Sequence, residues 1–254
     1  MTTLPAAYPD GRLRASSILL SALDQPRVRH MSPVLSTLQA DQYDHITADA
    51  RKPHLLDGGP GTGKSVVASH RASYLATSDA RLRSGVPNGV VLLVGPTADY
   101  ADHVRGVTDA LSADDSRLLV LDLPHLLDTL AGLAPPSGLH PTSYRDTARQ
   151  LLLLAKRAYK PLFSSMPSLR GSAPARVTEA LYTALRSNNT GRSTITTDRP
   201  IIRELQRLPT WSEARKARGQ RALIAGLHLI GGGRSPWGEI AHIIVDEAQD
   251  LTEA

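Results

Sequence analysis

The chain of 254 residues is long enough to bury one large hydrophobic core or two smaller ones. It contains no cysteine, which excludes disulfide bonds and metal centres ligated by cysteine. Residues 1–25 lack the continuous apolar core of a signal peptide, and no apolar run reaches membrane-spanning length. We therefore expect a cytoplasmic protein without a membrane partner.

The charge is unevenly distributed along the chain, whose net charge is +5. Residues 141–240 contain 17 Lys and Arg against 6 Asp and Glu, whereas the rest contains 12 against 18. A basic segment of this kind is typical of a surface that binds nucleic-acid phosphates or an acidic protein. The alternative is an arginine-rich helical surface that is simply solvated.

The first part of the chain contains one candidate helix. Residues 1–33 are rich in proline, and we interpret them as an N-terminal extension or linker. Residues 35–50 have the spacing of a helix. Gln42 in this helix carries an amide that could pair with the N6 donor and the N7 acceptor of adenine, although a glutamine is more often a surface residue.

A glycine-rich stretch follows, because residues 57–65 read Asp-Gly-Gly-Pro-Gly-Thr-Gly-Lys-Ser. His54-Leu55-Leu56 before it is interpreted as the end of a buried strand, and the apolar spacing of residues 66–75 predicts a helix. A strand, the pattern Gly-x-x-x-x-Gly-Lys-Ser and a helix, in this order, are typical of a phosphate-binding loop. The alternative is a glycine-rich turn that only begins a helix.

The residue types of this loop suit polyphosphate binding. Glycines let backbone N–H groups turn inward where a Cβ would obstruct them, and these groups form an anion nest with the helix N-terminus. Lys64 supplies a positive charge for the β- and γ-phosphate oxygens, and Ser65 offers its hydroxyl to Mg²⁺. The candidate nucleotide-binding residues are Gln42, Gly58, Gly59, Pro60, Gly61, Thr62, Gly63, Lys64 and Ser65.

Strand and helix patterns alternate after the loop. Residues 90–94 form the continuous apolar run of a parallel strand buried on both faces, and residues 117–122 are a further strand candidate. Helices are predicted at residues 98–111 and 124–130. The alternation indicates an α/β fold with a parallel sheet.

A basic segment without strand patterns interrupts this alternation. Residues 134–138, Ala-Pro-Pro-Ser-Gly, are a candidate boundary, and Gly231-Gly232-Gly233 is a candidate flexible return to the sheet. We interpret residues 134–239 as an all-helical insertion. Its predicted helices lie at residues 144–159, 175–185, 200–208 and 212–229.

A further apolar strand candidate ends in acidic residues, in the sequence Ile243-Ile244-Val245-Asp246-Glu247-Ala248-Gln249-Asp250. A strand that ends in Asp-Glu is common by itself. Combined with the glycine-rich loop, it places Asp246 to hold Mg²⁺ through water and Glu247 to polarise an attacking water. The candidate catalytic residues are Lys64 and Glu247, and the candidate Mg²⁺ ligands are Ser65 and Asp246.

The two motifs together resemble those of superfamily 1 helicases of the UvrD/Rep kind. They are Gly-Gly-Pro-Gly-Thr-Gly-Lys-Ser at residues 58–65 and Val-Asp-Glu-Ala-Gln-Asp at residues 245–250. Leu38-Gln39-Ala40-Asp41-Gln42 is similar to the adenine-reading glutamine motif of that family. HelD-type ATPases, a branch that acts on bacterial RNA polymerase, look similar at residues 35–42, 66–75 and 92–97.

The resemblance implies a P-loop NTPase (RecA-like) domain at residues 34–133 and 240–254, with ATP and Mg²⁺ as cofactors. It also implies that the insertion at residues 134–239 corresponds to the family's 1B domain and faces nucleic acid or RNA polymerase. Gly95-Pro96-Thr97 matches the place of a loop that contacts single-stranded DNA in true helicases.

The chain also departs from the family's pattern. It ends four residues after Asp250, so we expect an incomplete RecA-like domain that hydrolyses ATP slowly without a second domain or a separate RecA-domain subunit. Asp57 places an acid beside the anion site, and Val66 stands where UvrD-type enzymes often carry Arg.

Three hypotheses follow. The chain is part of an ATP-dependent helicase or translocase, a HelD-like remodeller of RNA polymerase, or a truncated or regulatory nucleotide-binding module without helicase activity.

Overall fold

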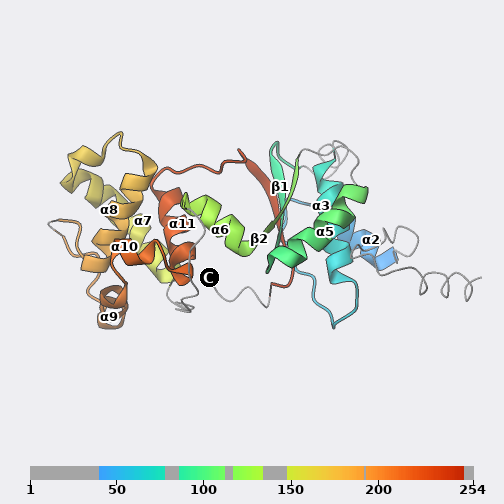
Figure 1. Ribbon diagram of the computed structural model, residues 1–254, viewed down its shortest axis with the longest axis horizontal. Helices are drawn as coiled ribbons and strands as arrows, with labels where there is room; N and C mark the ends of the chain where they lie inside the picture. The colour runs from blue at the N-terminus through green and yellow to red at the C-terminus, as the bar shows by residue number, and fades with distance from the viewer. Residues whose placement is uncertain (1–39, 78–85, 112–116, 134–147, 192, 249–254) are drawn as a thin grey trace, which may run out of the picture.

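The computed structural model describes residues 40–77, 86–111, 117–133, 148–191 and 193–248. Within these residues the protein is a mixed α/β structure with two parts, one built around a sheet and one made of helices (Figure 1). The expectations for residues 1–33, the candidate boundary at residues 134–138, and Gln249 and Asp250 lie outside the described residues.

Three parallel strands form one sheet in the order β2-β1-β3. The central strand β1 (Val90–Gly95) pairs with β2 (Leu118–Asp122) on one side and with β3 (Ile240–Val245) on the other. Residues 91–94 of β1 are at most 1% exposed. The apolar run therefore forms a parallel strand buried on both faces, as predicted.

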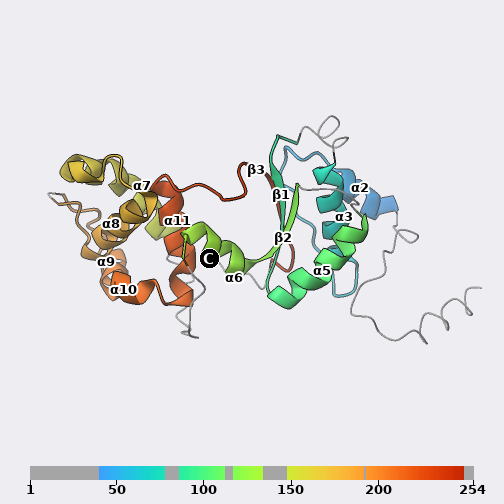
Figure 2. The same ribbon diagram turned by 45° about the horizontal axis from the view of Figure 1, so that its top comes forward.

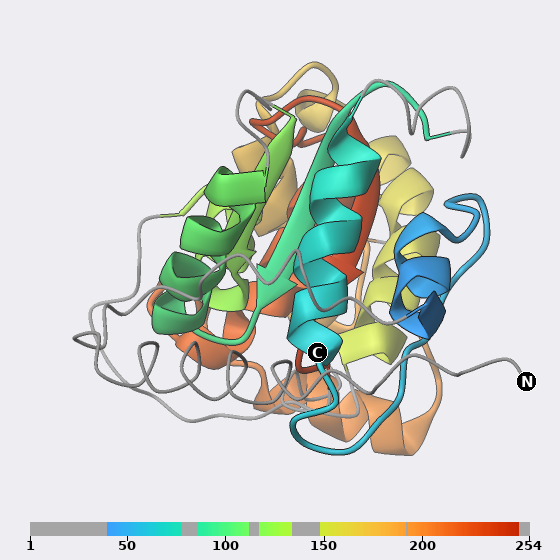
Figure 3. The ribbon, with the colours of Figure 1, turned by 90° about the vertical axis from the view of Figure 1, so that its right-hand side faces the viewer.

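Two helices cover one face of the sheet (Figure 3). They are α3 (Lys64–Ala76) and α5 (Ala98–Leu111), both close to their predicted bounds. A third helix, α2 (Ala40–Thr47), packs against α3. The apolar side chains of this layer are Ala72, Leu75, Ala101 and Val104, which pack with Val91, Leu93 and Val120 of the sheet.

The helix α6 (Leu123–Ala131) covers the opposite face of the sheet. Leu126 packs against the sheet residues Leu92 and Val94, whereas Ala131 lies in the core of the helical part. The side chain of Asp122 caps the start of α6 by accepting a hydrogen bond from the backbone N–H of His125 at 2.8 Å. This helix is therefore shared by both hydrophobic cores.

Five further helices form the helical part (Figure 2). Their common core contains Tyr182, whose hydroxyl donates to the carbonyl oxygen of Pro209 at 3.0 Å, together with many buried leucines. The helices are α7 (Ala148–Ser165), α8 (Pro174–Ser187), α9 (Arg199–Arg207), α10 (Trp211–Ala214) and α11 (Arg221–Ile230), with short 3-10 turns at Pro167–Leu169 and Arg218–Gln220.

A buried ion pair joins α6 to α11. Arg221 Nε lies 2.8 Å from Asp128 Oδ1, and both side chains are nearly inaccessible to solvent. Burial raises the pKa of Asp128, and the positive charge of Arg221 opposes that shift. Removal of one partner from such a pair costs about 3–5 kcal/mol, because the other charge stays buried without compensation.

The predicted strand at His54-Leu55-Leu56 is wrong. Residues 53–59 join no strand ladder, and Leu55 is 89% exposed. A buried strand needs a neighbouring strand to pair its backbone groups. The free edge of β3 is not used for such pairing, because among the described residues β3 pairs only with β1 and Ile243 on β3 is 53% exposed. A run of three apolar residues does not show whether a neighbouring strand exists.

The single helix predicted at residues 212–229 is also wrong, because the structure divides it into α10 and α11. Thr210 and Glu213 form a capping box that begins α10, which ends at Ala214. Gly219 lies in the intervening turn, and glycine costs about 1 kcal/mol in a helix interior. Residues 144–147 of the helix predicted at residues 144–159 lie outside the described residues, and the observed helix α7 continues to Ser165.

In the part of the chain that the structure describes, every helix is too short or too polar to span a lipid bilayer.

Candidate functional site

The glycine-rich loop leads directly into the N-terminus of α3. Gly61 and Gly63 have φ angles of 78° and 86°, which residues with a Cβ rarely adopt. The backbone N–H of Val67 donates to the carbonyl oxygen of Gly63 at 2.9 Å, and no side chain caps the start of the helix. The loop therefore presents the positive end of the helix dipole, which attracts anions.

Lys64 lies folded over this loop. Its Nζ donates to the carbonyl oxygens of Gly58 at 2.7 Å and Gly59 at 3.0 Å. The side chain is half-buried, so the positive charge stays beside the loop instead of extending into solvent. Ser65 follows in the first turn of α3, where its carbonyl oxygen accepts a hydrogen bond from Ser69 Oγ at 2.7 Å.

Some polar groups of the loop bind one another. The carboxylate of Asp57 accepts a hydrogen bond from the backbone N–H of Gly58 at 2.8 Å. Thr62 Oγ1 donates to the carbonyl oxygen of Gly59 at 2.9 Å. Asp57 therefore occupies one of the N–H groups that an anion would otherwise contact.

Gln42 on α2 lies against the loop. Its Nε2 donates to the carbonyl oxygen of Thr62 at 3.5 Å. A Cβ added to Gly63 would lie 3.0 Å from the same nitrogen, so Gln42 would have to move slightly if this residue carried a side chain. The structure thus brings Gln42 and the loop together although 20 positions separate Gln42 from Thr62.

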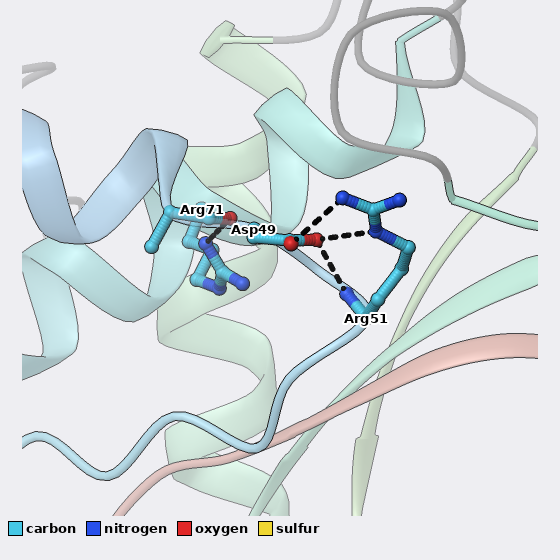
Figure 4. A network of polar contacts seen from close by, with 4 residues as sticks. Asp49, Arg51 and Arg71 are labelled. Carbon is cyan, nitrogen blue, oxygen red and sulfur yellow. Dashed lines mark hydrogen bonds and ion pairs between the residues drawn. The ribbon is translucent and has the colours of Figure 1, made fainter.

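Arg71 on α3 holds the C-terminal end of α2 (Figure 4). Its Nη1 donates to the carbonyl oxygens of His45, Ile46 and Ala48, each at 3.0 Å. The last carbonyl groups of a helix have no partner within the helix, so a buried cation at this position satisfies them. Arg71 is only 5% exposed, and its hydrogen bonds fix the end of the helix that carries Gln42.

Sequence reasoning placed Arg71 on α3 but gave it no role. The available signal was its position, because Val67, Arg71 and Leu75 follow one another at intervals of four residues. Residues spaced in this way share one helix face. Val67 and Leu75 are apolar and buried, so a charged residue between them required a buried partner.

Asp49 forms an ion pair with the exposed Arg51 next to this anchor (Figure 4). Hydrogen bonds from the side chain and backbone of Arg51 lower the pKa of Asp49 to about 2. Exposed ion pairs contribute little to stability because water and salt screen them. Arg51 therefore provides a matched comparison for Arg71.

The acidic pair lies at the end of β3. The backbone N–H of Asp246 donates to the carbonyl oxygen of Val94 at 2.9 Å, which continues the ladder between β1 and β3. Asp246 is 6% exposed. Its Oδ1 accepts a hydrogen bond from the backbone N–H of Glu247 at 2.9 Å, and its Oδ2 accepts one from the hydroxyl of Tyr100. Glu247 has a φ angle of 51°.

Tyr100 is a second residue that sequence reasoning missed. Burial, followed by the hydrogen bond to Asp246, raises the pKa of its phenol, which therefore stays protonated and acts as a donor. A single tyrosine in the first turn of a predicted helix gives no sign of its partner on a strand 146 positions away.

The loop and the acidic pair lie at the same edge of the sheet. Figure 3 shows β1 and β3 running towards the end of the molecule at which the glycine-rich loop enters α3. The helix α3 packs against both strands. The carboxyl edge of a parallel sheet is the usual place for a ligand in open α/β folds.

The oxygen atoms that could bind a metal ion at this edge belong to single side chains, the hydroxyl of Ser65 and the carboxylate of Asp246. Among the described residues, no three His, Asp or Glu side chains gather into a cluster that could hold a metal ion by themselves. A hydroxyl and a buried carboxylate suit Mg²⁺, which commonly takes one or two protein oxygens and completes its shell with water and phosphate oxygens. The residues thus fit an ion that arrives with a phosphorylated ligand.

Replacement of Arg71 by Leu should destabilise the protein by about 2–3 kcal/mol, because three carbonyl groups lose a charged donor. The effect should be local at first, with faster hydrogen exchange of the α2 amides. Chemical denaturation and hydrogen exchange measure the two effects. Arg51→Leu is the control and should change neither. Equal effects of the two substitutions would contradict the role assigned to Arg71.

Comparison with family models, with curated proteins and with solved structures finds no match for this chain.

Proposed function

We propose that the chain binds Mg-ATP at the glycine-rich loop, as the P-loop NTPase (RecA-like) domain of a UvrD- or HelD-like ATPase. The observation that carries this proposal is the position of the loop. Two glycines with positive φ open α3 at the edge of a parallel sheet where a buried aspartate ends the neighbouring strand. The pattern Gly-x-x-x-x-Gly-Lys-Ser at the start of a helix also supports it, although residues 53–59 before the loop form no strand.

Each residue has a distinct part in this proposal. The backbone N–H groups near Gly61 and Gly63 hold the polyphosphate, and Lys64 exchanges its two loop carbonyls for phosphate oxygens. Ser65 and, through water, Asp246 would hold the magnesium ion, which would neutralise negative charge on the phosphates. Glu247 accepts a proton from the attacking water, and Gln42 pairs with adenine.

The helical part supplies the proposed nucleic-acid surface. Arg199, Arg203 and Arg207 follow one another at intervals of four residues on α9, and all three are exposed. Their charges therefore lie along one face of the helix. Arg207 also pairs with Glu204 at 2.7 Å. A row of exposed arginines suits the phosphate backbone of nucleic acid better than an apolar protein surface.

A second candidate is a nucleotide-binding module without helicase activity. The described residues contain a single sheet, whereas translocation requires two RecA-like domains that close around ATP. An arginine from a second domain or partner is worth about 10³–10⁵ in rate in related phosphoryl-transfer systems. Slow hydrolysis by the isolated chain is expected for both candidates, and acceleration by nucleic acid or RNA polymerase separates them.

Lys64→Ala should weaken binding of a fluorescent ATP analogue at least about tenfold, because a charge-assisted contact to phosphate is lost. Equilibrium titration with Mg²⁺ measures the affinity. Lys52→Ala removes an exposed lysine before the loop and should leave the affinity unchanged. Equal affinities of wild type and Lys64→Ala would show that the loop is not the site.

Glu247→Gln should retain nucleotide affinity and lose residual hydrolysis by a factor of about 10²–10⁴, the usual contribution of a general base. The two readouts are analogue binding and single-turnover phosphate release. The control is Glu239→Gln, because Glu239 is exposed and directly precedes β3 at the end opposite Glu247. This substitution should change neither nucleotide affinity nor hydrolysis. Weaker binding by Glu247→Gln would contradict the division of roles between Glu247 and Asp246.

Neutralisation of the α9 arginines should reduce the salt dependence of DNA binding. Each phosphate contact contributes a log–log slope of about −0.9 on duplex DNA, so Gln at positions 199, 203 and 207 should lower the slope by up to about 2.7. Fluorescence anisotropy across a salt series measures it, with Arg105→Gln in the sheet part as control. An unchanged slope would contradict this surface, and polymerase capture without DNA binding would favour the HelD-like alternative.

A further inference from the structure

The carboxylate of Asp246 is held by two donors of different origin. Its Oδ1 accepts a hydrogen bond from the backbone N–H of the next residue, Glu247, whereas its Oδ2 accepts one from the hydroxyl of Tyr100 on α5. A carboxylate has about four lone-pair positions, so each oxygen keeps acceptor capacity after these two bonds. The two donors fix the plane of the carboxylate without saturating it.

Three features place Tyr100 beside this carboxylate. The hydroxyl oxygen of Thr97 accepts a hydrogen bond from the backbone N–H of Tyr100 at 3.2 Å. The carbonyl oxygen of Thr97 accepts one from the backbone N–H of Ala101 at 3.0 Å, so Thr97 sets the start of α5. Gly95 at the end of β1 leaves space for the ring, because a Cβ there would overlap it. The ladder between β1 and β3 brings Asp246 to the same edge.

We propose that Tyr100 is a positioning residue for Asp246, whose carboxylate it orients towards a magnesium ion bound with the nucleotide. This inference rests on the proposed function. Tyr100 itself does not contact the ion. By donating to Asp246, it restricts the rotation of a carboxylate that would hold the ion through water, and loss of such supporting donors typically weakens metal affinity or activity 10–100-fold.

The arrangement of the ring separates this role from simple packing. The ring lies over Gly95 and fills space, whereas only the hydroxyl contacts the carboxylate. Tyr100→Phe keeps the ring and removes the donor. A packing role predicts no change in metal dependence for this variant, whereas a positioning role predicts a specific change.

The test is a metal titration of nucleotide binding with the full chain. Binding of a fluorescent ATP analogue is measured in EDTA and at increasing Mg²⁺ or Mn²⁺. For Tyr100→Phe we expect the metal concentration at half-effect to rise about 10–100-fold, with unchanged affinity in EDTA. Tyr43→Phe removes the hydroxyl of an exposed tyrosine on α2 and should match wild type in both conditions.

A second variant covers the possibility that Tyr100→Phe folds poorly, which circular dichroism and thermal melting would detect. Gly95→Ala keeps the hydroxyl but displaces the ring, and it should raise the metal requirement in the same direction. A folded Tyr100→Phe protein with the wild-type metal requirement overturns the inference alone. A wild-type chain that binds the analogue without metal dependence, or does not bind it, overturns the proposed function as well.

Discussion

The pairing of β1 on both of its edges is the constraint on which the rest of the structure depends. Its central residues are almost completely buried, and it pairs in parallel with β2 on one side and, after an irregularity at Val90 and Val91, with β3 on the other. This register places Gly95 opposite Asp122 and brings Asp246 next to Val94. Because all three strands are parallel, the polar residues after them collect at one edge. Capping of α6, the close approach of Tyr100 and the burial of Asp246 all follow from that alignment.

The glycine-rich loop lies at the same edge, but it is held by contacts with residues of α2 and α3 and not by strand pairing. Lys64 binds carbonyl oxygens of its own loop, and Asp57 takes one of the loop's N–H groups. These contacts pair opposite charges and partial charges within the loop itself. Arg71 adds an anchor behind the loop, since it joins α3 to the end of the helix that carries Gln42. The position of Gln42 therefore depends on a buried cation about two turns along α3.

The helical part is joined to the sheet through α6. One side of this helix packs on β1, and its end lies in the core formed by α7, α8 and α11. The buried pair of Asp128 and Arg221 fixes α6 to α11 at the cost of desolvating two charges. A shift of either helix would leave one of these buried charges without its partner.

The sequence by itself determined the elements with strong local patterns. The strands β1 and β3 were predictable from their continuous apolar runs, and the helices α3, α5 and α8 from the spacing of their apolar residues. The glycine-rich loop was predictable because its backbone angles require glycine. Only the tertiary structure decided that His54 to Leu56 form no strand, since strand formation depends on a neighbour that the local sequence does not specify. It also decided the partners of Arg71, Tyr100 and Asp128, because each contact joins residues that only the packing of helices on the sheet brings together.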